Sequence, residues 1–122
     1  MKIYKCNMCG NVLEAINDKC DNVTCCNTPM KELKAFEVEG AKEKHIPVYN
    51  LEDNKLLVTV GEVLHPMDED HYIEFITYES GNNVFRVNLK PGDEPKCSFP
   101  YLGEGTLYAY CNKHGLWKSD VK

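Results

Sequence analysis

Long apolar runs, a basic charge excess and helical periodicity are all missing from this sequence. No stretch is long enough to cross a membrane, and the opening residues MKIYKCNMCG lack the apolar segment of a secretory signal. Lysine and arginine together number 14, against 19 aspartates and glutamates, which gives a net charge of −5. Because phosphate neutralisation requires a basic surface, this balance argues against a nucleic-acid binder. We therefore expect a cytoplasmic protein that binds neither membranes nor nucleic acids.

Histidine is absent from the first 44 residues, whereas five of the seven cysteines lie within the first 26. This segregation predicts two domains, one over residues 1–34 and a second over residues 35–122. The first domain is too short to close a good apolar core, so it needs a metal or a partner chain. The charged segment KELKAFEVEGAKEK, residues 31–44, is expected to be an exposed connection between the two.

The second domain is predicted to consist of short β-strands. The strand pattern is strongest in four runs, at residues 55–63, 71–78, 83–90 and 105–111. In the last run, alternation places Leu107, Ala109 and Cys111 on one face. Turns that contain glycine or proline separate the runs. Short antiparallel strands with such turns predict a mainly β fold, a small β-sandwich.

The N-terminal cysteines have the spacing of a metal site. CNMC supplies Cys6 and Cys9, and the adjacent pair Cys25 and Cys26 follows after a short interval. In a reducing compartment an odd number of cysteines indicates thiols or metal ligands rather than disulfides. Four sulfurs suit zinc or a single iron, and a purely structural zinc knuckle is the alternative. Neighbouring ligands require a constrained backbone, and Cys20 could replace one member of the pair.

The four histidines suggest a second metal site when they are considered together. Taken singly, each could be an ordinary surface or loop residue, but each lies at a predicted strand edge or loop. The loop between His65 and His71 can fold back to bring both imidazoles to one ion, and Cys111 precedes His114 by three positions. With His45, this set of four imidazoles and one thiolate is too large for a structural zinc tetrahedron. It suits a six-position metal with one open position, and nitrogen with sulfur suits iron.

These motifs make the sequence similar to the desulfoferrodoxins, a family of two-iron superoxide reductases. CNMCG with CC resembles the desulforedoxin-type iron site of that family, and three segments resemble its catalytic iron site: EKHIPV, HPMDEDHYI and CNKHGLW. Single-iron relatives, the neelaredoxins, lack the cysteine domain. The resemblance implies a small desulforedoxin- or rubredoxin-like metal domain followed by an immunoglobulin-like β-sandwich, assembled as a homodimer. It also implies a catalytic ferrous ion with four equatorial histidines and an axial cysteine, namely His45, His65, His71, His114 and Cys111.

The resemblance further implies a reaction, a donor and two additional residues. Superoxide takes up one electron and is released as hydrogen peroxide, without release of dioxygen. Lys44 attracts the anionic substrate, Glu43 closes the open position in the ferric state, and rubredoxin is the expected electron donor. The N-terminal metal could relay electrons or act structurally. Cys20 and Cys97 are not part of the family pattern.

Two other functions remain compatible with the residues alone. The chain could be a zinc-ribbon adaptor whose histidines are incidental. It could also be a rubredoxin-like electron carrier attached to an inert β-domain. Metal content distinguishes these possibilities, because only the superoxide reductase requires iron at the histidine-containing site.

Overall fold

The computed structural model describes residues 1–19, 22–37, 45–61 and 63–122, which form two compact units, Met1–Lys34 and Ala35–Lys122. The predictions for Cys20, Glu43 and Lys44 lie outside these described residues. In the part of the chain that is described, the fold has no helix that could serve as a membrane span. The prediction of a mainly β protein is confirmed.

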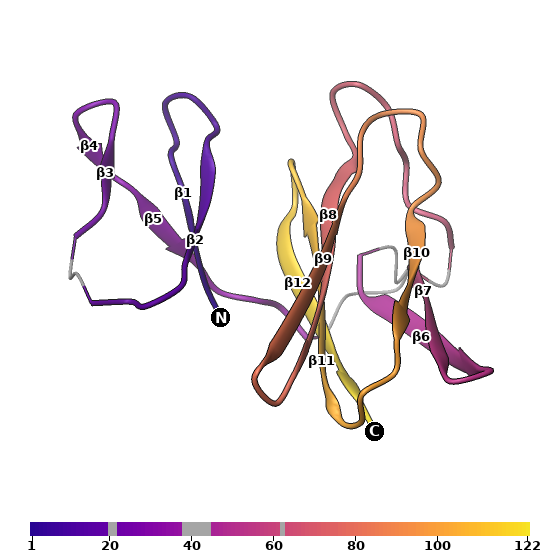
Figure 1. Ribbon diagram of the computed structural model, residues 1–122. Helices are drawn as coiled ribbons and strands as arrows, with labels where there is room; N and C mark the ends of the chain where they lie inside the picture. The colour runs from indigo at the N-terminus through magenta and orange to yellow at the C-terminus, as the bar shows by residue number, and fades with distance from the viewer. Residues whose placement is uncertain (20–21, 38–44, 62) are drawn as a thin grey trace. The chain divides into compact units, whose positions relative to one another are not determined.

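Unit 1 is built from short antiparallel strands (Figure 1). They are β1 (Lys2–Lys5), β2 (Val12–Ala15), β3 (Thr24–Cys25), β4 (Thr28–Pro29) and β5 (Lys31–Leu33). β1 lies between β2 and β5, while β3 and β4 form a separate two-stranded ladder. The predicted exposed connection is therefore wrong at its first three residues, because Leu33 pairs with Ile3.

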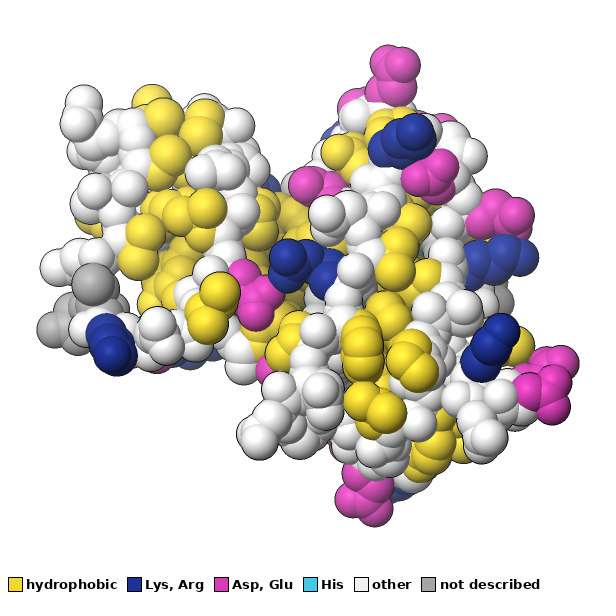
Figure 2. All heavy atoms as spheres, in the orientation of Figure 1, with side chains coloured by type: hydrophobic (Ala, Val, Ile, Leu, Met, Phe, Trp, Pro, Cys, Tyr) yellow, Lys and Arg dark blue, Asp and Glu magenta, His cyan; other side chains and the backbone are white. Residues whose placement is uncertain are grey.

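Unit 1 buries little apolar surface. Among its described residues Ile3 is buried, and Tyr4, Cys6 and Met30 form a small buried cluster. By contrast, the side chain of Ile16 is 90% exposed. Figure 2 shows apolar side chains spread over the visible face of this unit. So small a cluster contributes too little hydrophobic free energy to hold the fold by itself.

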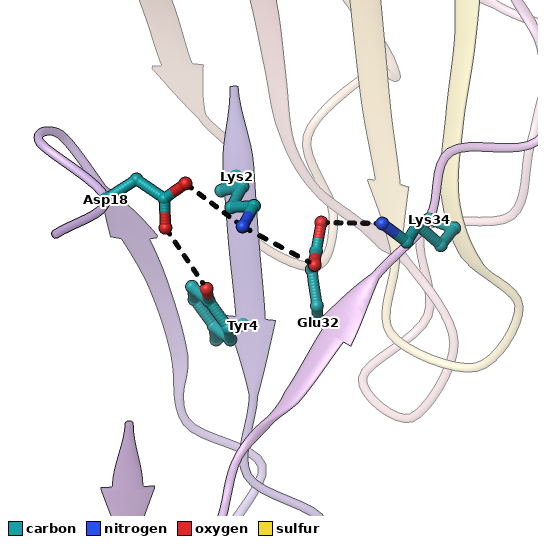
Figure 3. Close-up of polar contacts among 5 residues, drawn as sticks. All are labelled: Lys2, Tyr4, Asp18, Glu32 and Lys34. Atoms are coloured by element: carbon teal, nitrogen blue, oxygen red, sulfur yellow. Dashed lines mark hydrogen bonds and ion pairs between the residues drawn. The ribbon is translucent and has the colours of Figure 1, made fainter. Parts of the chain in front are cut away.

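Polar contacts on the sheet around β1 add little to the folding stability of unit 1 (Figure 3). The ammonium of Lys2 lies 3.0 Å from a carboxylate oxygen of Asp18 and 3.9 Å from one of Glu32. Glu32 also pairs with Lys34 at 3.0 Å, and the Tyr4 hydroxyl donates to Asp18 at 3.5 Å. Because exposed ion pairs typically contribute about 0–1 kcal/mol, these contacts cannot replace a core.

Unit 2 is a β-sandwich of two antiparallel sheets, as the strand pattern predicted. One sheet has the order β10-β7-β6 and the other β12-β11-β8-β9. The strands are β6 (Pro47–Glu52), β7 (Lys55–Val60), β8 (Ile73–Ser80), β9 (Asn83–Asn88), β10 (Lys96–Pro100), β11 (Gly105–Cys111) and β12 (Gly115–Val121). Leu107, Ala109 and Cys111 all lie in the core between the sheets, which confirms the predicted face of β11.

Gly105 is needed where β11 begins. A Cβ built on Gly105 would overlap the backbone carbonyl oxygen of Glu79 in the neighbouring strand. We expect Gly105→Ala to destabilise unit 2 by about 3 kcal/mol, since β8 and β11 would have to move apart. Urea unfolding followed by the fluorescence of Trp117 measures this change. Gly92→Ala is the control, because its Cβ would meet open space and only its positive φ of 91° is unfavourable, at about 1 kcal/mol. Equal losses in the two variants would contradict the steric explanation.

Candidate metal centres

The antiparallel sheets of unit 2 bring the four histidines and Cys111 to one end of the sandwich. His65 follows the end of β7, and His45 precedes the start of β6, which is paired antiparallel to β7. In the other sheet, Cys111 ends β11 and His71 precedes the start of its antiparallel neighbour β8. His114 lies in the turn between β11 and β12. The possible ligand atoms of these five residues all lie within 4.8 Å of one another.

The four imidazoles form a closed ring. The ring centroids of His45 and His65 are 4.7 Å apart, and those of His65 and His71 are 4.8 Å apart. The ring centroids of His71 and His114 are 4.9 Å apart, and those of His114 and His45 are 4.8 Å apart, so the four rings form a closed cycle. Each neighbouring pair meets edge to face, at interplanar angles from 62° to 82°. Such an arrangement turns one nitrogen of each ring toward a shared centre.

Two of the ring nitrogens indicate that this centre is built for a cation. The Nδ1 of His65 lies 2.7 Å from the carbonyl oxygen of Pro66, to which it donates, so Nε2 carries the free lone pair. The Nε2 atoms of His65 and His71 are buried without a hydrogen-bond partner. Leaving buried polar atoms unpaired costs about 1–3 kcal/mol each, and a metal ion would satisfy both at once. The residues present therefore fit a metal.

Cys111 completes the donor set from the protein interior. Its side chain is fully buried, and its Sγ lies 3.8 Å from Nδ1 of His114. Burial raises the pKa of the Cys111 thiol, while the backbone N–H groups of Lys113 and His114 act in the opposite direction. A bound cation would hold this sulfur as the thiolate, and these N–H groups would then donate to it.

The buried position of His65 predicts a pH dependence of stability in the metal-free protein. Burial lowers the pKa of His65 from 6.5 to about 4; the hydrogen bond to Pro66 opposes this shift, and the nearby histidines add a smaller lowering. Between these two values the unfolded chain binds a proton at this position and the folded chain does not. Stability is therefore highest above pH 6.5 and falls by about 3 kcal/mol as the pH approaches 4. Urea unfolding in the presence of a chelator, read by Trp117 fluorescence, measures this change. His65→Gln should reduce the slope, and an identical slope in the variant would contradict the assignment.

Trp117 covers one side of the imidazole ring system. Its ring stacks on His45 at 4.9 Å with an interplanar angle of 16°, and its indole N–H donates to the carbonyl oxygen of His114 at 3.0 Å. Asn112, in the same turn, binds the segment around His71. Sequence analysis assigned no role to either residue. Their position inside the segment CNKHGLW was the only signal for them, because their contacts are made across strands.

The four N-terminal cysteines meet in unit 1. Their Sγ atoms lie within 4.8 Å of one another, with Cys9 to Cys25 at 3.7 Å and Cys25 to Cys26 at 4.0 Å. Cys6 follows β1, and the turn after it is closed by the Gly10 N–H donating to the Cys6 carbonyl at 2.9 Å. Cys26 has a φ of 54°, which is the constrained backbone expected for adjacent ligands.

The thiols of this four-cysteine group also fit a cation. The backbone N–H of Cys9, with that of Met8, lowers the pKa of Cys6 to about 7. Side-chain hydrogen bonds with Cys6 and Cys9 raise the pKa of Cys25 to about 12. Four sulfurs this close cannot all be thiolates unless a positive ion neutralises them, and four thiolates suit zinc or iron.

Cys97 takes no part in either group. It lies on β10 at the edge of the core of unit 2, and burial raises the pKa of its thiol to about 12. A half-buried thiol with so high a pKa carries almost no thiolate near neutral pH and is therefore poorly reactive.

Known proteins resemble the chain over nearly its whole length. Residues 37–120 match the family described as desulfoferrodoxin, and residues 1–33 match the desulfoferrodoxin N-terminal domain. A desulfoferrodoxin homolog from Archaeoglobus fulgidus is 46% identical over 120 residues, which cover 98% of this chain and 96% of that protein. The crystal structure of the superoxide reductase from Treponema pallidum shares the fold, with a TM-score of 0.80 at 22% identity over 97% of this chain and 96% of that one. The superoxide reductase (1Fe-SOR) from Giardia intestinalis is 33% identical, with a TM-score of 0.58, over 66% of this chain and 99% of that one.

Proposed function

The chain belongs to the desulfoferrodoxin family, and on this basis we propose that it is a superoxide reductase with a mononuclear iron bound by four histidines and one cysteine. The observation that carries the proposal is the closed ring of imidazoles beside the buried Cys111. In the reaction, superoxide takes up one electron and two protons and becomes hydrogen peroxide, and no dioxygen is released.

The iron would be held by His45, His65, His71, His114 and Cys111. When bound, it supplies the single electron that superoxide requires. Nitrogen and thiolate donors suit iron, and neutral imidazoles add no charge of their own. Of the five ligands, the four imidazoles are neutral and only the Cys111 thiolate is charged, and this low ligand charge favours the ferrous over the ferric state.

Individual residues prepare this site for the metal. The bond from His65 to the Pro66 carbonyl selects the tautomer whose Nε2 can coordinate. Burial keeps that imidazole neutral, and its low pKa of about 4 means that protons compete weakly for Nε2. Cys111 approaches from the core, whereas His114 is exposed, so the imidazole ring system can be reached from solvent.

Glu43 and Lys44 are proposed to act on the substrate side, by the family resemblance of EKH at residues 43–45. A carboxylate suits ferric iron, so Glu43 would close the open position after the product leaves. Lys44 would attract superoxide. The net charge of −5 repels superoxide only weakly, since salt screens charges beyond about 8 Å. A cation close to the site therefore dominates the last part of the approach of superoxide to the iron.

Lys44→Ala should slow the bimolecular reaction with superoxide by about tenfold at low ionic strength. The visible spectrum of the iron should stay the same, because no ligand changes. Pulse radiolysis over a range of salt concentrations measures the rate. Lys55→Ala is the matched control, since Lys55 begins β7 at the strand end away from His65. Equal rates for the two variants would refute the role of Lys44.

The four-cysteine group is proposed to hold a second iron, or zinc, through Cys6, Cys9, Cys25 and Cys26. A structural role is supported by the small core of unit 1. An electron-relay role is the alternative. The family resemblance suggests a homodimer in the cytoplasm with rubredoxin as its electron donor. Light scattering of the purified protein tests the homodimer, and oxidation of reduced rubredoxin by the ferric protein tests the donor.

Rapid mixing of the reduced protein with superoxide tests the central function. We expect one hydrogen peroxide for each iron oxidised and no dioxygen. Dioxygen release with half a peroxide per superoxide would indicate dismutation instead. Metal analysis completes the test, because iron bound only by sulfur would favour the electron carrier and zinc alone would favour the adaptor.

A further inference from the structure

The pairing between β8 and β11 is irregular where it reaches the proposed iron site. Tyr110 pairs with Phe75, but the next residue, Cys111, pairs with Ile73, so the register shifts by one residue. Beyond this bulge, the N–H of Asn112 donates to the carbonyl of Tyr72 at 3.2 Å. The strand that carries Cys111 therefore stays attached to the segment of His71 after regular pairing ends.

The side chain of Asn112 continues this attachment on both sides of His71. Its Oδ1 accepts from the N–H of Tyr72 at 2.9 Å, and its Nδ2 donates to the carbonyl of Asp70 at 3.0 Å. Two backbone hydrogen bonds also close the loop from Asp68 to His71. The N–H of Asp68 donates to the carbonyl of His71 at 3.0 Å, and the N–H of His71 donates to the carbonyl of Asp68 at 3.2 Å. Asn112 thus binds the residues on both sides of His71, a proposed ligand that ends a tight loop.

A carboxamide fits the two contacts that Asn112 makes. The backbone N–H of Tyr72 needs an acceptor and the carbonyl of Asp70 needs a donor, and the amide group carries these on two separate atoms, whereas a Ser or Thr hydroxyl has both on one oxygen. Aspartate would keep the acceptor but place a negative oxygen against the Asp70 carbonyl. Lys113 also reaches Asp70, at 3.7 Å, but both side chains are largely exposed and such a pair contributes little.

We propose that Asn112 is a positioning residue, which holds His71 in place relative to Cys111 and His114 before the metal binds. The inference rests on the proposed iron site and adds a residue that touches neither metal nor substrate. Its consequence is a higher affinity of the site for metal. Loss of such an outer contact typically lowers metal affinity about 10- to 100-fold.

The test uses the full-length chain, reduced and stripped of metal, and titrated with Co²⁺. Trp117 is the only tryptophan, and it stacks on His45, so quenching of its fluorescence reports metal binding at the histidine site. Asn112→Ala and Asn112→Asp should each weaken binding about 10- to 100-fold. Asn83→Ala, an exposed position at the start of β9, should not change it.

Two further measurements separate positioning from a merely structural role. The urea midpoint of each metal-free variant reports stability, and amide exchange at Tyr72 reports whether its hydrogen bond to Asn112 is lost. A lower midpoint with unchanged Co²⁺ affinity would overturn the proposal, as would unchanged affinity in Asn112→Asp if Asn112→Ala does not fold. Failure of the wild-type chain to quench with Co²⁺ would instead refute the metal site itself.

Discussion

Replacing Cys111 by serine is expected to stop superoxide reduction while leaving the β-sandwich folded. The sulfur is the proposed anionic ligand, and a serine hydroxyl does not ionise in its place, so the site would lose its negative charge. The rate should fall more than 100-fold, because loss of an outer contact alone can cost about 100-fold. Thiolate-to-iron absorption should vanish as well. Stopped-flow mixing with superoxide and visible spectroscopy measure these two effects.

Cys97→Ser is the matched control for that experiment. Cys97 packs at the edge of the same core, and in the metal-free chain burial raises the pKa of both thiols. Both substitutions replace a thiol by a hydroxyl. If the hydroxyl makes no hydrogen bond, each lowers the free energy of unfolding by about 1–3 kcal/mol. Only Cys111→Ser should change the spectrum and the rate. Normal iron absorption in Cys111→Ser would show that this sulfur is not a ligand.

Removing metal from the four-cysteine group should unfold unit 1 and spare unit 2. Two of the four cysteines, Cys6 and Cys25, belong to or pack on the small apolar cluster of Tyr4 and Met30, so the metal and the core support the same turns. Binding of a structural metal is worth on the order of 10 kcal/mol in small domains. Hydrogen exchange of the chelated, reduced chain should therefore show fast amides in β1 and β5 and continued protection in β11.

A substitution separates metal loss from other effects of the chelator. Cys9→Ser in metal-replete buffer should reproduce the unfolding of unit 1. Met8→Ser should not, because the Met8 side chain is 71% exposed beside the same ligands. Persistent protection of β1 in the chelated chain would mean that the contacts around Tyr4 and Lys2 suffice without metal.

In unit 2 the sequence predicted β7, β8, β9 and β11, where apolar residues alternate or cluster, but it did not single out β6, β10 or β12. Leu107, Ala109 and Cys111 are apolar or sulfur-bearing at every second position, and one face of β11 is the core. β5 was missed because Lys31–Leu33 has mostly charged side chains. Its place is decided by pairing with β1, a contact that local composition does not record.

The sequence by itself determined which side chains can bind metal. Spacing and residue type identified Cys6, Cys9, Cys25 and Cys26 as one group, and the scarce histidines with Cys111 as another. The tertiary structure alone decided how these side chains are held. The ring of imidazoles, the tautomer of His65 and the grip of Asn112 on the His71 loop all depend on backbone atoms brought together from distant strands. Donor chemistry is a property of single residues, whereas orientation is a property of the packed sheets, and so only the first can be deduced from the order of amino acids.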